Sequence, residues 1–438
     1  MTVLSYALGV LLFVVGVGAS IGLHEMGHLI PGKLFDVKVT QYFVGFGRTL
    51  WSRTRGETEY GIKAVPLGGY VKLVGMLPPA PDSAPGTARG SRTGMFAQLM
   101  SDARSMEYEL VEEGDEERLF YRLVWWKRII IMASGVVTNL VIAFLLFAVV
   151  LMGHGVPTTT TTVDQVSQCV IAVTKANENK PQRACTPNDQ ESPAKTAGFR
   201  PGDRIVSFNG APIKSWGMLQ KKIRGNDNGA VAIGVVRDGR ALTLNTNTTV
   251  SSRANPDDPA TVSSVGFLGV GPTTYYQRKG LGFVASTMAT STWDTLKVLG
   301  TLPNKVYHVG RAAVGLEKRD QNGPMSVVGA GRVAGEMTSQ QSVPVSDRFF
   351  SVLGLLAALN LFLGLFNLVP LPPLDGGPIA ATLYEAGRRG LAKVFHRPDP
   401  GFVDAAKLLP VTYVMAALIL VVSVVLVYAD IVAPVQFQ

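Results

Sequence analysis

Residues 19–28 read Ala19-Ser20-Ile21-Gly22-Leu23-His24-Glu25-Met26-Gly27-His28, and no charged residue precedes His24 in the chain. On a helix, His24 and His28 are four residues apart and project from one face. Both imidazoles can then bind one Zn²⁺, while Glu25 can accept a proton from a water molecule at that site. Ionisable residues inside a membrane-length segment are costly and indicate function. The alternatives are a chance pentapeptide, or histidines that only form hydrogen bonds within a helix bundle.

The composition indicates a membrane protein that carries at least one water-soluble module. The chain has 438 residues, of which 47% are hydrophobic, and its mean hydropathy is positive. The net charge of +9 comes from basic residues that mostly flank apolar runs, as topology signals do. No segment is dense in Lys and Arg with interleaved aromatic residues, so we expect no nucleic-acid partner.

Four apolar runs are long enough to cross a lipid bilayer. We predict transmembrane helices within residues 1–30, 125–153, 350–377 and 408–430. The first run has no basic segment before it and leads directly into the histidines, so we interpret it as a retained helix, not a cleaved signal peptide. The second begins at Trp125-Trp126-Lys127-Arg128, which suits a membrane interface.

The basic residues near the ends of these runs predict the orientation. They lie within segments 31–128 and 372–407, which the positive-inside rule places in the cytoplasm. Both termini and the long segment 153–349 are then expected outside a bacterial plasma membrane. His28 and the end of the third run emerge on the same, cytoplasmic side.

The first cytoplasmic segment has two parts. Residues 31–76 contain short alternating runs and Gly-rich turns, which predict a membrane-associated β-hairpin region. Beside an intramembrane site, such a sheet could hold an extended substrate by strand addition, or it could be an ordinary loop-side sheet. Residues 77–124 are expected to hold a flexible insertion, rich in Pro, Ser, Ala and Gly, and a solvated acidic helix at Glu107–Arg118.

The outer segment also divides in two. Ser192–Gly210 predicts a short helix, a glycine turn and a strand that ends in an Asn-Gly turn, so residues 163–250 resemble a PDZ domain. Residues 271–345 form an amphipathic region, in which Leu281–Val314 is expected on the membrane surface. Cys169 and Cys185 lie close together in sequence, so one disulfide and two free thiols both remain open.

A hydrolytic zinc centre needs a third protein ligand and one open position. The nearby candidates fail, because Phe46–Ser52 contains no Glu and because Pro31 and Leu34 occupy the positions of the Gly and third His of metzincins. Asp375 lies far away in Asn367-Leu368-Val369-Pro370-Leu371-Pro372-Pro373-Leu374-Asp375-Gly376-Gly377, where three prolines break the third helix. Broken helices are tolerated where they line a cavity. The alternative is an aspartate of an ordinary cytoplasmic turn.

Taken in order, these motifs resemble the site-2 protease family, in particular the regulator-of-sigma-E proteases and their actinobacterial single-PDZ counterparts. The resemblance rests on the H-E-M-G-H and L-D-G-G sequences, the PDZ-like region and the loop Gly45-Phe46-Gly47. It implies a zinc metalloendopeptidase in which Gly45, Phe46, Gly47 and Asn367 bind substrate. The chain departs from the family at Gly135-Val136-Val137-Thr138-Asn139, which lacks a proline, and in its proline-rich linker.

The predicted fold class is therefore a polytopic α-helical membrane protein with a cytoplasmic-side β-sheet and an extracytoplasmic α+β PDZ domain. His24, His28 and Asp375 are the expected Zn²⁺ ligands, and Glu25 is the expected general base. A helical substrate must unwind before cleavage, because its backbone groups are already paired.

The resemblance implies single-span substrates that a site-1 protease has already shortened, such as anti-sigma factors, whose cleavage activates a sigma factor in a stress response. The PDZ-like domain would read new C-termini or filter substrates by size. Two rival functions are a catalytically silent PDZ-bearing membrane scaffold and a metal transporter, although a transporter would be expected to have several polar spans.

Overall fold

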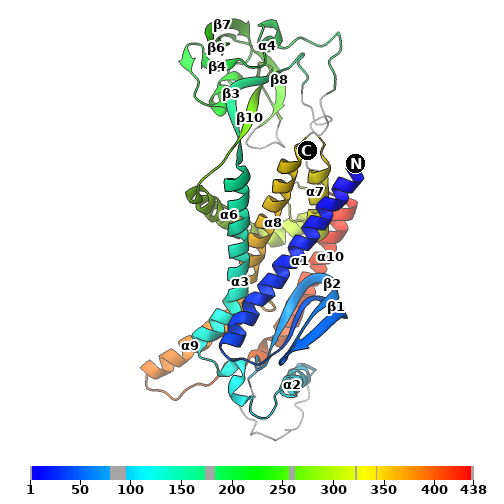
Figure 1. The fold of residues 1–438 in the computed structure, drawn as a ribbon, viewed down its shortest axis with the longest axis vertical. Coiled ribbons are helices and arrows are strands. Elements are labelled where there is room, and N and C mark those ends of the chain that lie inside the picture. The colour runs from blue at the N-terminus through cyan, green and yellow to red at the C-terminus, as the bar shows by residue number, and fades with distance from the viewer. Residues whose placement is uncertain are drawn as a thin grey trace. The chain divides into compact units, whose positions relative to one another are not determined.

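The computed structural model describes residues 2–78, 95–172, 183–255, 262–320, 323–341 and 343–435. Most of the predicted flexible insertion, residues 79–94, lies outside this part. The chain forms two compact units, which are treated separately (Figure 1). The membrane unit comprises Met1–Gly153 and Gly280–Phe437, and the β-rich unit comprises His154–Lys279.

Four helices in the described residues are long and apolar enough to cross a membrane, which confirms the predicted fold class. They are α1 (Thr2–Leu34), α3 (Trp125–Ala148), α8 (Val345–Asn367) and α10 (Leu409–Val432). α3 continues as a π-helical segment, Val149–His154, and the short helix η4 (Ala405–Leu408) precedes α10. α1 extends beyond the expected end at residue 30, with Pro31 inside it, and α8 ends at Asn367, just before the prolines.

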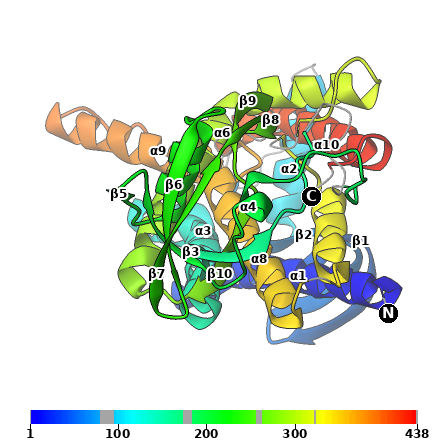
Figure 2. The same cartoon turned by 90° about the horizontal axis from the view of Figure 1, so that it is seen from above.

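Small residues bring the helices of the membrane unit close together. α1 packs against α3, α8 and α7 (Val327–Ser339) (Figures 1 and 2). A Cβ added at Gly9 would lie 2.0 Å from Thr338 Oγ1, and one at Gly16 would lie 2.6 Å from Leu356 Cδ1. At Gly9 the Cβ would also lie 2.6 Å from the Ala334 carbonyl oxygen, so this approach of α7 requires glycine.

The helix α7, which lies within the amphipathic region expected at 271–345, has a buried face. Ala330 and Ala334 are buried in a core cluster with Phe13 and Val17 of α1. The helix α6 (Leu281–Ala313) packs along α10, α8 and α3. Small residues in a membrane favour such helix–helix contacts.

A long two-stranded antiparallel sheet lies against α1. Its strands are β1 (Val39–Arg55) and β2 (Thr58–Leu73) (Figures 1 and 2). The register is irregular around Val44–Thr49, where Gly45 and Gly47 adopt positive φ angles of 95° and 83°. A side chain would strain the backbone at both positions.

The acidic segment differs from the prediction. Its helix, α2, is Met95–Tyr108, and residues 109–118 form turns that end in the short helix η1 (Glu116–Arg118). The carboxylate of Glu107 accepts hydrogen bonds from the backbone N–H groups of Met76 and Leu77. Asp115 forms a 2.6 Å ion pair with buried Lys38. These two carboxylates therefore contact the β1–β2 region and are not fully solvated. The composition of the segment does not reveal these contacts.

The β-rich unit contains a six-stranded sheet with the order β10-β3-β4-β6-β7, in which β5 pairs with β4. A separate pair, β8 with β9, completes its strands. The strands are β3 (Val156–Val166), β4 (Arg204–Phe208), β5 (Ala211–Pro212), β6 (Ala230–Arg237), β7 (Arg240–Asn247), β8 (Thr249–Ala254), β9 (Val262–Phe267) and β10 (Val270–Gln277). The unit is wider than residues 163–250, because β3 and β10 pair with each other.

The helices of this unit begin at serine caps. Ser192 precedes α4 (Pro193–Thr196) and Ser215 precedes α5 (Trp216–Arg224), and each hydroxyl accepts a backbone N–H of the first turn. The core is built from alternating strand residues such as Ile205 and Ile233. Such alternation is typical of a sheet that is buried on one face.

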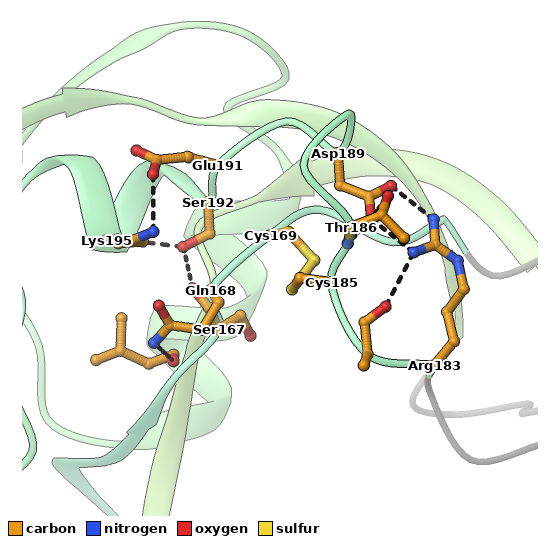
Figure 3. Close-up of a disulfide and its surroundings, with 12 residues drawn as sticks. Ser167, Gln168, Cys169, Arg183, Cys185, Thr186, Asp189, Glu191, Ser192 and Lys195 are labelled. Carbon is orange, nitrogen blue, oxygen red and sulfur yellow. Dashed lines mark hydrogen bonds and ion pairs between the residues drawn. A yellow bond between two sulfur atoms is a disulfide. The ribbon is translucent and has the colours of Figure 1, made fainter.

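Cys169 and Cys185 form a disulfide (Figure 3). The pairing decides between the two alternatives that the sequence left open. Beside it, Arg183 makes a bidentate ion pair with Asp189, which also accepts a hydrogen bond from the Thr186 backbone N–H (Figure 3).

Candidate metal centre

His24 and His28 lie in the second half of α1, on the same face of the helix. Their Nε2 atoms are 3.4 Å apart, and both side chains are buried. His28 Nδ1 lies 2.8 Å from the carbonyl oxygen of Ile131 in α3. Because this carbonyl is an acceptor, Nδ1 carries the proton and Nε2 is left as a free ligand.

Asp375 reaches the histidines from a tight turn between two helices. α8 ends at Asn367, and Asp375 is the N-cap residue of α9 (Gly376–Val394). A Cβ at Gly376 would lie 2.2 Å from the Val369 carbonyl oxygen, so a glycine is needed for the turn to close. The prolines and glycines that break the third span thus fold the chain back towards α1.

The three side chains converge on one point. Asp375 Oδ2 lies 3.3 Å from His24 Nε2 and 3.4 Å from His28 Nε2. In a tetrahedral zinc site with bonds of about 2.0–2.1 Å, neighbouring ligand atoms lie about 3.3–3.4 Å apart. The three distances observed here therefore match those that Zn²⁺ requires. Asp375 Oδ2 and His24 Nδ1 are buried and have no hydrogen-bond partner in the described residues. Two imidazoles and a carboxylate at these distances fit zinc.

Asp375 supplies an acidic side chain beside the two imidazoles. A carboxylate is the form that binds a metal cation.

Two glycines allow α3 to approach the histidines. A Cβ at Gly135 would lie 2.2 Å from His28 Nε2 and 2.8 Å from His24 Cε1. A Cβ at Gly27 would lie 2.8 Å from the Ser134 carbonyl oxygen. The sequence singled out the Gly135–Asn139 segment without a role, and the structure places Gly135 directly against both rings.

The candidate ligands open into a cavity of about 740 Å³ in the membrane unit. Glu25 and Asn367 line this cavity with the three ligands, as does buried Asn139. The cavity is therefore formed by parts of the chain that lie more than 300 residues apart in sequence. It combines an apolar lining with a few convergent polar groups, as is typical of binding sites.

The sheet contributes residues of β2 to the cavity. Residues 68–71 of β2 line the cavity, whereas Gly45, Phe46 and Gly47 are not among its lining residues. Phe46 instead stacks on Tyr70, with ring centroids 6.3 Å apart. A Cβ at Gly69 would lie 2.8 Å from Glu25 Cγ, so the strand passes directly beside this carboxylate. Nothing in the sequence pattern indicated that approach.

Sequence reasoning also missed Asn360. Its side chain is fully buried in α8 and donates to Ser20 Oγ of α1 over 3.0 Å. Ser20 lies one turn before His24, so the contact fixes α8 against the ligand-bearing part of α1. A lone asparagine in an apolar run is a signal that could have found it.

Two buried histidines and a half-buried aspartate lie together among four membrane-length helices, with a glutamate in the same cavity. This arrangement defines a membrane metallohydrolase. The family model of Peptidase family M50 matches residues 12–397. The chain is 32% identical to zinc metalloprotease Rip1 of Mycobacterium tuberculosis H37Rv, over 98% of this chain and 99% of that protein. It is 31% identical to Rip1 of Mycolicibacterium smegmatis, with 98% of each covered. It is 29% identical to metalloprotease MmpA of Caulobacter vibrioides, over 86% of this chain and 85% of that protein.

The chain belongs to peptidase family M50, the site-2 protease family. It is a multi-pass membrane protein and a zinc metalloprotease. The buried group of His24, His28 and Asp375 could hold the metal.

Proposed function

We propose that this chain makes the second cut in the regulated intramembrane proteolysis of single-span membrane proteins, and that anti-sigma factors are among its substrates. The observation that carries the proposal is the shared cavity of the three candidate ligands and Glu25. The released cytoplasmic fragment would activate a sigma factor. The anti-sigma class comes from the family resemblance of the sequence.

Each polar residue of the cavity has a role in the proposal. His24, His28 and Asp375 hold zinc, which when bound acts as a Lewis acid and activates water for hydrolysis. Glu25 takes the proton from the attacking water and delivers it to the leaving nitrogen. Asn367 holds the substrate backbone by hydrogen bonds.

The cleaved segment is held as an extended strand beside Gly69. Gly69, Tyr70 and Val71 pair with β1 on one side only, because no other described strand pairs with them. Their other edge can add a substrate strand next to Glu25. Gly45, Phe46 and Gly47 support this strand from β1, through the contact of Phe46 with Tyr70.

The orientation follows the charge pattern. The zinc end of α1 lies near the cytoplasmic side of the bacterial plasma membrane, and the β-rich unit lies outside. The Cys169–Cys185 disulfide supports an oxidising compartment for that unit. We assign the β-rich unit as the PDZ domain, which reads the new C-termini of shortened substrates or excludes long ones.

The proposal is tested with Glu25→Gln. The variant is expected to keep one equivalent of zinc and to cleave a pre-shortened single-span substrate about 10²–10⁴-fold more slowly. Glu113→Gln, at an exposed glutamate, is the matched control and should cleave normally. Unchanged cleavage by Glu25→Gln would exclude the mechanism. A wild-type chain that binds such substrates but never cuts them would support the silent scaffold instead.

A further inference from the structure

The helix α9, which follows Asp375, exposes an apolar face. Leu383, Tyr384, Leu391, Val394 and the following Phe395 are each more than half exposed. Gly387 and Gly390 lie on the same face, because these positions recur every three or four residues. A helix on a water-exposed surface shows polar residues outward, so this pattern is reversed. Figures 1 and 2 show α9 extending away from the other helices of the membrane unit.

The opposite face of α9 fixes its position at the end of a membrane span. Glu385 is buried and pairs with Arg128 of α3 over 2.5 Å. Arg128 lies in the first turn of α3, two residues after Trp126, and both Trp125 and Trp126 are exposed, at 48% and 45%. Exposed tryptophans at the end of a span mark the membrane–water interface. α9 is therefore attached at the interfacial end of α3.

The charges near the apolar face are basic. Lys393 and Arg397 are exposed and form no ion pair within the described residues. The nearby acidic groups are already engaged, since Glu385 pairs with Arg128 and Asp399 pairs with Arg389 over 3.1 Å. An apolar face beside unpaired basic residues complements an anionic lipid surface.

We propose that α9 is an interfacial membrane anchor. Its apolar face lies at the boundary of headgroups and acyl chains, and Lys393 and Arg397 bind anionic phospholipid headgroups. Asp375 is the N-cap residue of α9, so the anchor also fixes the depth and direction of the turn that presents this residue. The occupant is the lipid surface and not a second copy of the chain.

The full-length protein in vesicles allows a direct test. A fluorophore is attached to Leu391→Cys, with the native disulfide intact, and nitroxide-labelled phosphatidylglycerol or phosphatidylcholine is added at equal mole fraction. Both lipids should quench the probe, and the anionic lipid should quench about twofold more strongly because basic residues enrich it locally. The same probe in a Lys393→Glu/Arg397→Glu background should lose this difference.

Two controls test whether quenching occurs at any exposed site and whether any change in net charge has the same effect. A probe at Glu113→Cys, an exposed site outside α9, should not be quenched. Lys214→Glu/Lys221→Glu, in the β-rich unit, makes the same charge change and should keep the twofold difference at residue 391. An unquenched Leu391 probe, or disulfide cross-links between copies of the unlabelled Leu391→Cys variant, would overturn the anchor. Equal quenching by both lipids would overturn the anionic-headgroup site. No arm needs catalysis, so these outcomes are independent of the proposed function.

Discussion

Gly135 shows how one missing side chain can control the candidate metal centre. Its Cα faces both imidazoles, and any Cβ there would overlap His28 Nε2. The ring of His28 cannot move away without losing its contact with the Ile131 carbonyl oxygen. The orientation of a candidate ligand thus depends on a residue of another helix.

Gly135→Ala is therefore expected to weaken zinc binding. Displacing a group that orients a ligand typically lowers metal affinity by about 10–100-fold. The dissociation constant, measured by competition with a chelator, tests this expectation. Gly354→Ala is the matched control, because this glycine of α8 has nothing within 4 Å of its added Cβ. Equal affinities in the two variants would show that the close contact is unimportant.

Asp203 provides a residue-scale test in the β-rich unit. Its side chain is fully buried and accepts hydrogen bonds from Arg237 and from the Arg200 backbone N–H. Burial raises the pKa of Asp203, but these bonds prevail and lower it below its usual range. The resulting stability is fully present above the unfolded pKa of about 3.9 and disappears as the pH falls through the lower folded value.

Asp203→Asn should destabilise the β-rich unit by about 3 kcal/mol at pH 7, because it leaves the Arg237 charge without its partner. Thermal unfolding of the full chain, followed at pH 7 and at pH 3, measures the difference. The difference in the free energy of unfolding between wild type and Asp203→Asn should be smaller at pH 3 than at pH 7. Asp238→Asn, at an exposed neighbour, should have almost no effect. A stability difference that grows towards pH 3 would contradict the lowered pKa of Asp203.

At the scale of elements, β2 is the strand that meets the catalytic glutamate of the proposed mechanism. A Cβ added at Gly69 would lie 2.8 Å from Glu25 Cγ and 2.8 Å from the Phe43 carbonyl oxygen, so neither could stay in place. Gly69→Val is expected to reduce cleavage at least tenfold through misplacement of Glu25, since small displacements of catalytic groups are costly. Zinc content should remain unchanged. Gly271→Ala in β10, where a Cβ has ordinary contacts, is the control, and normal cleavage by Gly69→Val would exclude β2 from the site.

The sequence predicted the elements that have strong local signals. The apolar runs and the broken third span gave the four helices, and polar residues in those runs identified His24, His28 and Asp375 as candidates. α9 was not predicted, because Gly387 and Gly390 have low helix propensity and the Arg128–Glu385 contact that stabilises the helix is distant in sequence. The approaches of Gly69 and Gly135 are likewise tertiary, so no local pattern encodes them.

At the scale of the whole molecule, the proposal assigns the two ends of the membrane unit to opposite compartments. A cysteine at Lys214, in the β-rich unit, should react with a membrane-impermeant maleimide in intact cells. A cysteine at Glu113 should react only after the cells are opened. Both sites are exposed in the structure. The reverse labelling pattern would invert the proposed topology and place the disulfide in a reducing compartment.

We propose that one zinc site is assembled from two segments of the chain that lie about 350 residues apart, one with His28 and one with Asp375. Zinc-edge X-ray absorption of the purified full-length protein, combined with metal analysis, tests it most directly. Wild type should contain one zinc per chain, with two imidazole nitrogens and oxygen ligands at about 2.0–2.2 Å. Asp375→Ala should lose most of the zinc. A variant that keeps a full equivalent with an unchanged spectrum would contradict the account, because the third ligand would then lie elsewhere.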